Sequence, residues 1–362
     1  MNMKHLDKLY TSWLHIFNPY DTFPYKLDPK IPMFDGHAYK INPRHQHVYD
    51  KLFIVQSQFI QGGKLNELKN PTFPLFIKPR WGHKTASSKD CYKINSLEEL
   101  TPHLHKKNMM WSEFIDATEG MTDFVLVNGE IVYQLTYVYS EKQHGFADVW
   151  KHVSSENKPP VEVVDWVSKH MTHYTGPLNV QYRSTTIIEV GMRFARSGMY
   201  IESSAHKPLI DSINAMWKTK TWSCREDLTI KPFYSFKCWS SIPVVCLVSQ
   251  HVIDLIIYYF GAMPFYEYYF EPTGKHSIVF FQFLHRDFKK GMQLRYVLEL
   301  LLSIVNGSFI LLCLLCIGFY ATGMKYKPIL YILIAMFILS MDNSLNVLYN
   351  QFVNQKQFLT LL

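Results

Sequence analysis

The chain has 362 residues, 48% of them hydrophobic, and a formal net charge of +7 at pH 7. This length and apolar content allow a core-bearing domain with one or two attachments, and they exclude an intrinsically disordered chain. The charge suits acidic ligands, phosphates or an anionic membrane surface and selects none of them. No helix-turn-helix, zinc-finger or RNP signature occurs, so we expect no nucleic-acid partner.

The first predicted element of the soluble part is a helix over residues 47–63. Apolar side chains recur there at helical spacing, and the pair Gly62-Gly63 is a typical stop signal. Lys51 would lie in the first turn of this helix.

A strand, a loop, a helix and a second strand are expected next. The apolar run 73–79 predicts a short buried strand that ends in Lys78 and Pro79, and the small-residue loop 81–88 after it is rich in hydrogen-bond donors. Residues 96–104 begin with a Ser cap and a Glu three positions later, which predicts a helix. Residues 109–115 read as a strand.

Antiparallel strands are predicted for the rest of this region. Residues 122–139 form a hairpin around an Asn-Gly turn, and residues 159–174 form a helix that opens on proline. The runs 178–183 and 185–190 are two strands separated by a short turn. This order predicts an α+β fold with antiparallel sheet rather than a doubly wound βαβ repeat.

The sequence becomes compatible with lipid after about residue 296. Residues 300–320 carry no charge over the roughly 20 positions that a bilayer requires. The run 328–341, extended to Tyr349, predicts a second membrane helix and therefore a hairpin. Residues 242–262 are ambiguous between an amphipathic helix docked on the protein or membrane surface, which we favour, and a third span with a polar stripe.

The basic cluster at 285–295 stands just before the clear span, which by the positive-inside rule places the soluble part on the cytosolic side of the membrane. The predicted divisions are a short N-terminal segment at 1–45, a soluble domain at 46–240, an amphipathic or membrane-associated connector at 241–296 and a transmembrane hairpin at 297–362.

Charged and amide side chains stand at the ends of the predicted strands and in the first turn of the first helix. Lysines and arginines beside a donor-rich loop suit phosphates, and Glu and Gln oxygens suit Mg²⁺, which shares phosphate oxygens. Phosphoryl transfer needs mainly positioning and charge stabilisation. The set is coherent for ATP·Mg²⁺ and consists of Lys51, Lys78, Glu113, Glu119, Gln181, Arg183, Glu189 and Arg193.

Four segments occur in an order that resembles the ATP-grasp family, over about residues 45–205. They are "YDKLFIVQSQFIQGG", "FPLFIKPRWGH", "WSEFIDATEGMTDFVLVNGEIV", and "GPLNVQYR" followed by "IIEVGMRF". The resemblance implies a two-lobed ATP-grasp-like domain, followed here by C-terminal transmembrane helices. It also implies a carboxylate activated as an acyl phosphate for attack by an amine, with both substrates unidentified.

The same resemblance implies roles for individual residues around ATP. Lys51 and Lys78 would contact the nucleotide phosphates, which the 81–88 loop, with Gly82 and Ser87, would cover. The adenine would meet the backbone of Glu113, Phe114 and Ile115, and the ribose hydroxyls would meet Glu119.

It further implies that Gln181 and Glu189 approach Mg²⁺ and that Arg193 stabilises the transferring phosphoryl group. The alternative for Glu189 is a purely structural role, in a salt bridge to Arg183 or Arg193. Asp123, in the hairpin arm, is expected on the surface.

One departure from the family pattern bears on catalysis. Gly191 stands where the family has a metal-binding Asn, so one Mg²⁺ would lose a ligand. Three interpretations stay open: a membrane-anchored carboxylate–amine ligase, a catalytically degenerate membrane protein that binds or scaffolds, and an unrelated α+β domain with accidental matches.

Overall fold

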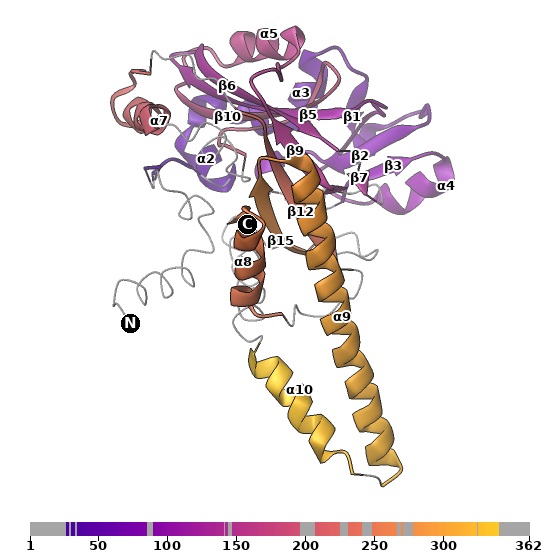
Figure 1. The fold of residues 1–362 in the computed structure, drawn as a ribbon. Helices are drawn as coiled ribbons and strands as arrows, with labels where there is room; N and C mark the ends of the chain where they lie inside the picture. The colour runs from indigo at the N-terminus through magenta and orange to yellow at the C-terminus, as the bar shows by residue number, and fades with distance from the viewer. Residues whose placement is uncertain are drawn as a thin grey trace.

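The computed structural model describes most of the chain outside the two termini, with short gaps. The described residues are 27–28, 30–32, 35–84, 90–140, 142–143, 147–195, 207–224, 231–240, 248–265, 269–270, 278–323 and 325–339. Within them, two sheets form the body of the molecule and one long helix leads away from it (Figure 1).

The smaller sheet is antiparallel and has the strand order β1-β4-β2-β3. Its strands are β1 (Gly62–Lys64), β4 (Met109–Glu113), β2 (Leu75–Pro79) and β3 (Tyr92–Ile94). Its core is made by alternate residues such as Leu75 and Ile77, which are fully buried. Helix α4 (Leu97–Leu100) follows β3, and the Ser96 hydroxyl accepts the Glu99 N–H, as the predicted cap requires.

The larger sheet is also antiparallel and runs β11-β10-β5-β6-β9-β12-β15-β13, with β14 pairing on β15. Its strands in chain order are β5 (Glu119–Val127), β6 (Glu130–Tyr139), β9 (Trp150–Val153), β10 (Gly176–Arg183), β11 (Thr186–Gly191), β12 (Phe233–Ser240), β13 (Met263–Phe265), β14 (Tyr269–Phe270) and β15 (Ile278–His285). The turn at Asn128 and Gly129 is confirmed, since both have positive φ. Two further short strands, β7 (Lys142–Gln143) and β8 (Ala147–Asp148), pair with each other.

Apolar cores cover both faces of this sheet. Helix α5 (Val161–His170) packs Val163 and Val167 against the side chains of Phe124 and Leu178. Helix α7 (Lys207–Thr219) packs Leu209 with the cluster on the opposite face, which includes Val125. The two helices lie in Figure 1 at the top and left of the sheet.

The first predicted helix ends earlier than the sequence suggests. A 3₁₀ turn over Pro43–Tyr49 leads into helix α3 (Lys51–Ser57), whose first turn Asp50 caps by accepting the Leu52 N–H. The helix stops because Phe59 takes a φ of 60°. Gly62 and Gly63 then belong to β1, where a Cβ on Gly62 would lie 2.6 Å from Val55 Cγ1. Gly62 is therefore a close-packing contact between helix and strand rather than a stop signal.

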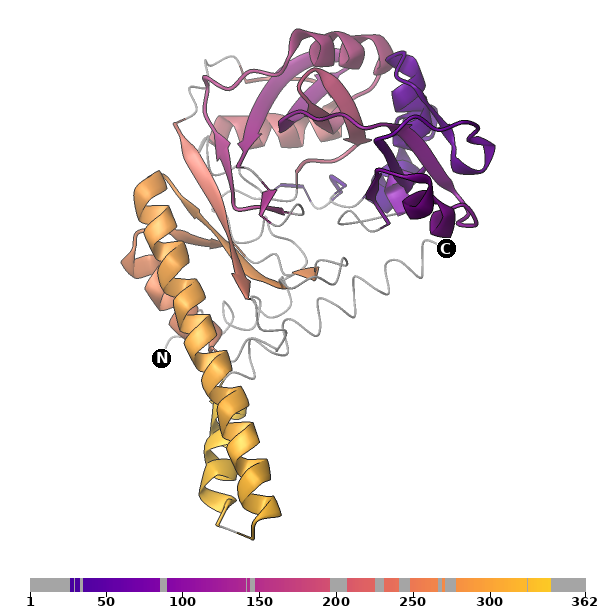
Figure 2. The ribbon, with the colours of Figure 1, turned by 90° about the vertical axis from the view of Figure 1, so that its right-hand side faces the viewer.

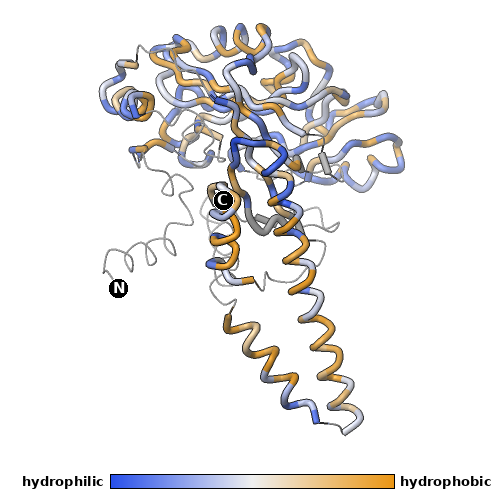
Figure 3. The backbone as a smooth tube through the Cα atoms, in the orientation of Figure 1, coloured by the Kyte–Doolittle hydropathy of each residue, from blue (hydrophilic) through white to orange (hydrophobic). Residues whose placement is uncertain are grey.

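The C-terminal part is dominated by helix α9 (Phe288–Ala321), whose 34 residues extend well beyond the sheets (Figure 2). Its first half packs Gly291, Leu294 and Leu298 on the sheet. Its second half is mostly hydrophobic (Figure 3), and apolar side chains there, such as Leu311, are exposed. By length and composition it is the one helix in the described part of the chain that could cross a membrane.

The other two apolar segments form shorter helices. Helix α10 (Lys327–Leu339) has 13 residues and packs beside the far end of α9, and the remainder of the predicted second span lies outside the described residues. Helix α8 (Gln250–Tyr259) has 10 residues, too few to cross a bilayer. Because β13 and β15 belong to the larger sheet, the sheet extends past the predicted domain limit at residue 240.

Candidate functional site

The strand register gathers polar side chains on one face of the larger sheet. In β10, Gln181 lies opposite Glu189 of β11, and Asn179 lies opposite Gly191. On its other side, Asn179 lies opposite Asp123 of β5. Because directly opposed and alternate residues share a face of an antiparallel sheet, these side chains all project to the same side. Gln181 and Glu189 therefore lie side by side on adjacent strands.

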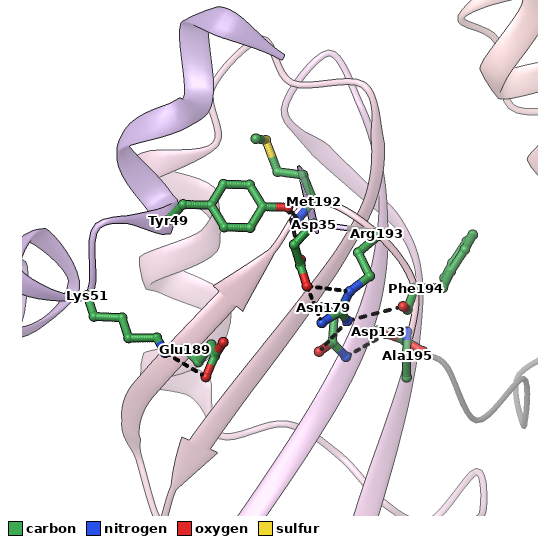
Figure 4. A network of polar contacts seen from close by, with 10 residues as sticks. All are labelled: Asp35, Tyr49, Lys51, Asp123, Asn179, Glu189, Met192, Arg193, Phe194 and Ala195. Atoms are coloured by element: carbon green, nitrogen blue, oxygen red, sulfur yellow. Dashed lines mark hydrogen bonds and ion pairs between the residues drawn. The ribbon is translucent and has the colours of Figure 1, made fainter. Parts of the chain in front are cut away.

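Two buried lysines reach this face from the smaller sheet and its helix. Lys51, the first residue of α3, places Nζ 3.3 Å from Glu189 Oε2. Lys78, in β2, donates from Nζ to the Ile188 carbonyl at 2.9 Å. Both lysines are less than 8% exposed. The contacts therefore join the two sheets at β11, and Glu189 is paired with Lys51 rather than with Arg183 or Arg193 (Figure 4).

Burial and the neighbouring charges shift the pKa values of Lys51, Lys78 and Glu189. Burial, and then the charge of Lys51, lowers the pKa of Lys78 to about 8. Burial opposes the charged form of Lys51 as well, but Glu189 outweighs it and raises the Lys51 pKa. For Glu189, burial is outweighed by Lys51 and Lys78, which hold its pKa below the usual value. At neutral pH the cluster is two cations around one carboxylate, an arrangement that favours an added anion.

Arg193 is held by a second ion pair. Its Nε and Nη2 donate to Asp35 Oδ2 at 3.1 and 2.9 Å, and its Nη1 donates to Asn179 Oδ1 at 3.3 Å. Asp35 is the first residue of helix α2 (Asp35–Ile41). The buried Tyr49 hydroxyl donates to Asp35 Oδ1 at 3.1 Å and accepts the Met192 N–H at 2.9 Å (Figure 4). The guanidinium of Arg193 is therefore fixed by helix α2 and by β10.

Asp123 lies behind this pair and is fully buried, so the expectation that it lies on the surface is wrong. Its carboxylate accepts hydrogen bonds from the Tyr137 hydroxyl at 2.7 Å, the Asn179 amide at 2.8 Å and the Ala195 N–H at 2.9 Å. Burial raises the Asp123 pKa to about 6, against the effect of these donors. Asp123 therefore positions Asn179 and the chain after β11.

The predicted adenine segment connects β4 to β5 and hence the smaller sheet to the larger one. Arg183 Nη1 donates to the Ile115 carbonyl at 3.1 Å, and Arg183 Nη2 lies 3.5 Å from Glu119 Oε2. The Lys93 ammonium lies over the Phe114 ring, 4.1 Å from the ring centroid. Glu113 is exposed at the end of β4. Arg183 thus ties the connecting segment to the site.

The donor-rich loop is described only in its first part, helix η4 (Gly82–Lys84), so Ser87 lies outside the described residues. A Cβ on Gly82 would lie 3.5 Å from both Glu189 Oε1 and Lys51 Cε. The loop therefore begins directly against the ion pair. The His83 ring stacks on Tyr39 of α2, with centroids 3.7 Å apart.

Solved structures supply the comparison, since no family model and no curated protein matches the chain. The chain is similar to N5-carboxyaminoimidazole synthase from Aspergillus clavatus, in complex with ADP and 5-aminoimidazole ribonucleotide. The TM-score is 0.51 and the identity 11%, over 73% of this chain and 78% of that one. The chain has an ATP-grasp fold.

Other ATP-grasp structures align less closely. L-amino acid ligase from Bacillus licheniformis gives a TM-score of 0.46 at 14% identity, over 70% of this chain and 71% of that one. N5-carboxyaminoimidazole synthetase from Staphylococcus aureus, complexed with ADP, gives 0.48 at 14% identity and the same coverage. The alignment with the Aspergillus clavatus enzyme confirms the predicted ATP-grasp-like fold, and at 11% identity that similarity concerns the fold alone.

The donor set of this ATP-grasp chain fits a magnesium ion that is shared with phosphates. Glu189, the Gln181 amide and Asp35 offer oxygens on or above one face of the sheet. Among the described residues, no three His, Cys, Asp or Glu side chains converge to hold a metal alone. Mg²⁺ typically takes only one or two protein carboxylates and completes its shell with phosphate oxygens and water.

Sequence reasoning missed two residues at the centre of this site, Asp35 and Tyr49. Asp35 belongs to the segment set apart as a short N-terminal piece, 158 residues from its partner Arg193. No local periodicity signals such a contact. Tyr49 lies one residue before the Asp50 cap, and its position beside Lys51 was the one available hint.

Proposed function

We propose that the chain binds ATP·Mg²⁺ where the two sheets meet and uses it to activate a carboxylate for attack by an amine. The observation that carries the proposal is the cluster of buried Lys51 and Lys78 with half-buried Glu189, which joins the sheets beside the loop that begins at Gly82. Lys51, Lys78 and Arg193 place three cations at this junction, which favours an anionic metal–nucleotide complex.

The proposed reaction has two steps. A carboxylate oxygen of the substrate attacks the γ-phosphorus, the bond to the β-phosphate oxygen breaks, and ADP leaves. The amine nitrogen then attacks the carbonyl carbon of the acyl phosphate, inorganic phosphate departs with the electron pair of the carbon–oxygen bond, and the nitrogen releases its proton. Lys51, Lys78 and Arg193 would hold the phosphates, and Glu189 with Gln181 would hold Mg²⁺, which neutralises charge on the transferring group.

Hydroxylamine trapping tests this chemistry. Full-length protein in detergent, given ATP, Mg²⁺, hydroxylamine and a panel of carboxylates, is expected to release ADP and form a hydroxamate with at least one carboxylate. Hydroxylamine intercepts an acyl phosphate whichever amine is the natural acceptor. Failure to bind nucleotide at millimolar ATP would contradict the proposal.

A second candidate is a catalytically degenerate protein that binds nucleotide as a scaffold. It is favoured by Gly191, which has no side-chain oxygen, and by Arg193, whose guanidinium is engaged by Asp35. Tight nucleotide binding without ADP release across the same panel would support this candidate.

We also propose that α9, with α10 and the chain after it, anchors the protein in a lipid bilayer. The exposed apolar second half of α9 motivates this, and α8 adds a face with Leu255, Tyr258 and Tyr259 each more than 60% exposed, which suits the membrane interface. Basic residues at the start of α9 favour a cytosolic position for the ATP-grasp domain.

Extraction of membranes with alkaline carbonate tests the anchor. The full chain is expected to stay in the membrane pellet, because carbonate strips proteins held by charge but not those held by apolar spans. Complete release into the supernatant would contradict the anchor and leave the nucleotide proposal untouched.

A further inference from the structure

We infer that Asp35 supplies, from helix α2, the second carboxylate of the nucleotide–metal site, in the space of the side chain that β11 lacks at Gly191. The inference rests on the proposed nucleotide function and deepens it. It assigns a ligand role to a residue outside the four segments that resemble the ATP-grasp family.

The first observation is steric. A Cβ placed on Gly191 would lie 2.6 Å from Asp35 Oδ1, closer than two such atoms can approach. The carboxylate oxygen thus occupies the volume into which the first side-chain atoms of residue 191 would extend. Any residue larger than glycine at position 191 would collide with the Asp35 carboxylate. Glycine at this position is therefore what allows Asp35 to lie so close to β11.

The second observation concerns the face of the strand. Residues 189 and 191 are two apart in β11, and alternate residues project to the same side. The Asp35 carboxylate, lying over position 191, therefore stands on the same face as the Glu189 carboxylate. Both are flanked by cations, Lys51 for Glu189 and Arg193 for Asp35.

The third observation is that Asp35 is held in place. Its Oδ2 accepts both bonds from Arg193, while Oδ1 accepts one bond, from the Tyr49 hydroxyl. Tyr49 is buried and is itself fixed by the Met192 N–H at the end of β11. A carboxylate oxygen has two lone pairs, so Oδ1 keeps capacity for a cation. A pair of carboxylates with phosphate oxygens is a typical Mg²⁺ environment.

The test compares nucleotide affinity with and without metal in the full-length protein. ADP is titrated in excess Mg²⁺ and again in EDTA, and the ratio of the two dissociation constants gives the metal dependence. For Asp35→Asn we expect this ratio to fall by about 10-fold or more, with the EDTA affinity changed by less than about threefold. An Asp35 that only neutralised Arg193 would leave the ratio unchanged, which would overturn the inference.

A matched control and an exchange variant complete the design. Asp28→Asn removes another carboxylate, paired with Lys218 at 3.3 Å, and should leave the ratio as in the wild type. The double variant Asp35→Gly with Gly191→Asp moves the carboxylate onto β11 and should restore the wild-type ratio. If Asp35→Asn does not fold, this double variant tests the inference in its place. A wild type that binds ADP with no metal dependence overturns this inference alone, whereas one that binds no nucleotide at all overturns the proposed function with it.

Discussion

Replacing Lys78 with alanine is expected to weaken nucleotide binding by about 10- to 150-fold. A charge-assisted hydrogen bond contributes about 1.5–3 kcal/mol, and that range corresponds to this loss in affinity. Lys78 is buried in β2 and directed at β11, where it donates to the Ile188 carbonyl, so its truncation removes a cation from the junction of the two sheets. Isothermal titration of the full-length protein with ATP and Mg²⁺ measures the effect.

Lys64→Ala is the matched control, because Lys64 is an exposed lysine of the same sheet, paired with Glu67. It should bind nucleotide as the wild type does. An equal loss in both variants would point to a general loss of positive charge rather than to a specific contact by Lys78.

The Lys78 pKa of about 8 gives the same prediction a pH signature. Between pH 7 and pH 9 the protonated fraction falls from about nine-tenths to about one-tenth, so affinity should drop by nearly 10-fold. Lys78→Arg keeps its charge and should lose this dependence.

Loss of stability would not imitate this pH effect. The folded pKa of Lys78 lies below its ordinary value of 10.5, so the unfolded chain binds the additional proton between pH 8 and 10.5. The contribution of Lys78 to the free energy of unfolding therefore rises with pH through this window. Weaker binding at pH 9, in a chain whose melting temperature is unchanged or higher, would confirm the assignment, and flat binding would refute it.

Replacing Gly291 with alanine is expected to reduce the free energy of unfolding by about 1–3 kcal/mol, the usual cost of overpacking a core. A Cβ there would lie 2.2 Å from Phe236 Cε2 and 2.3 Å from Phe236 Cζ. The Phe236 ring is fully buried and stacked on Phe283 with centroids 5.2 Å apart, so it cannot move aside. Alanine is the better helix former by about 1 kcal/mol, which offsets part of the cost.

Gly318→Ala provides the control on the same helix, because no atom lies within 4 Å of a Cβ at that position. It should leave the melting temperature of the protein in detergent unchanged or raise it slightly. If both variants melted like the wild type, α9 would not be docked on β12 through Gly291. The contact matters because it joins the candidate membrane helix rigidly to the sheet that carries Glu189.

Local chemistry in the sequence determined much of the architecture. The Asn128-Gly129 turn, the Ser96 cap and the buried strand ending at Lys78 each depend on residues within a few positions of one another, so pattern alone predicts them. The end of the first helix could not be predicted from such local patterns. It depends on Phe59 in a left-handed conformation and on the close approach of Gly62 to Val55, which is a tertiary contact.

In the candidate site, too, the sequence determined some features and the tertiary structure determined others. The sequence by itself determined which residue types stand at the strand ends, and therefore that Lys51, Lys78 and Glu189 suit a phosphate and a metal. Only the tertiary structure decided their partners: Lys51 with Glu189, and Arg193 with Asp35 at a separation of 158 residues. A buried charge must be paired, because removing it from water is costly. Which opposite charge is close enough to pair with it depends on how the segments pack, and the spacing of residues along the chain does not contain that information.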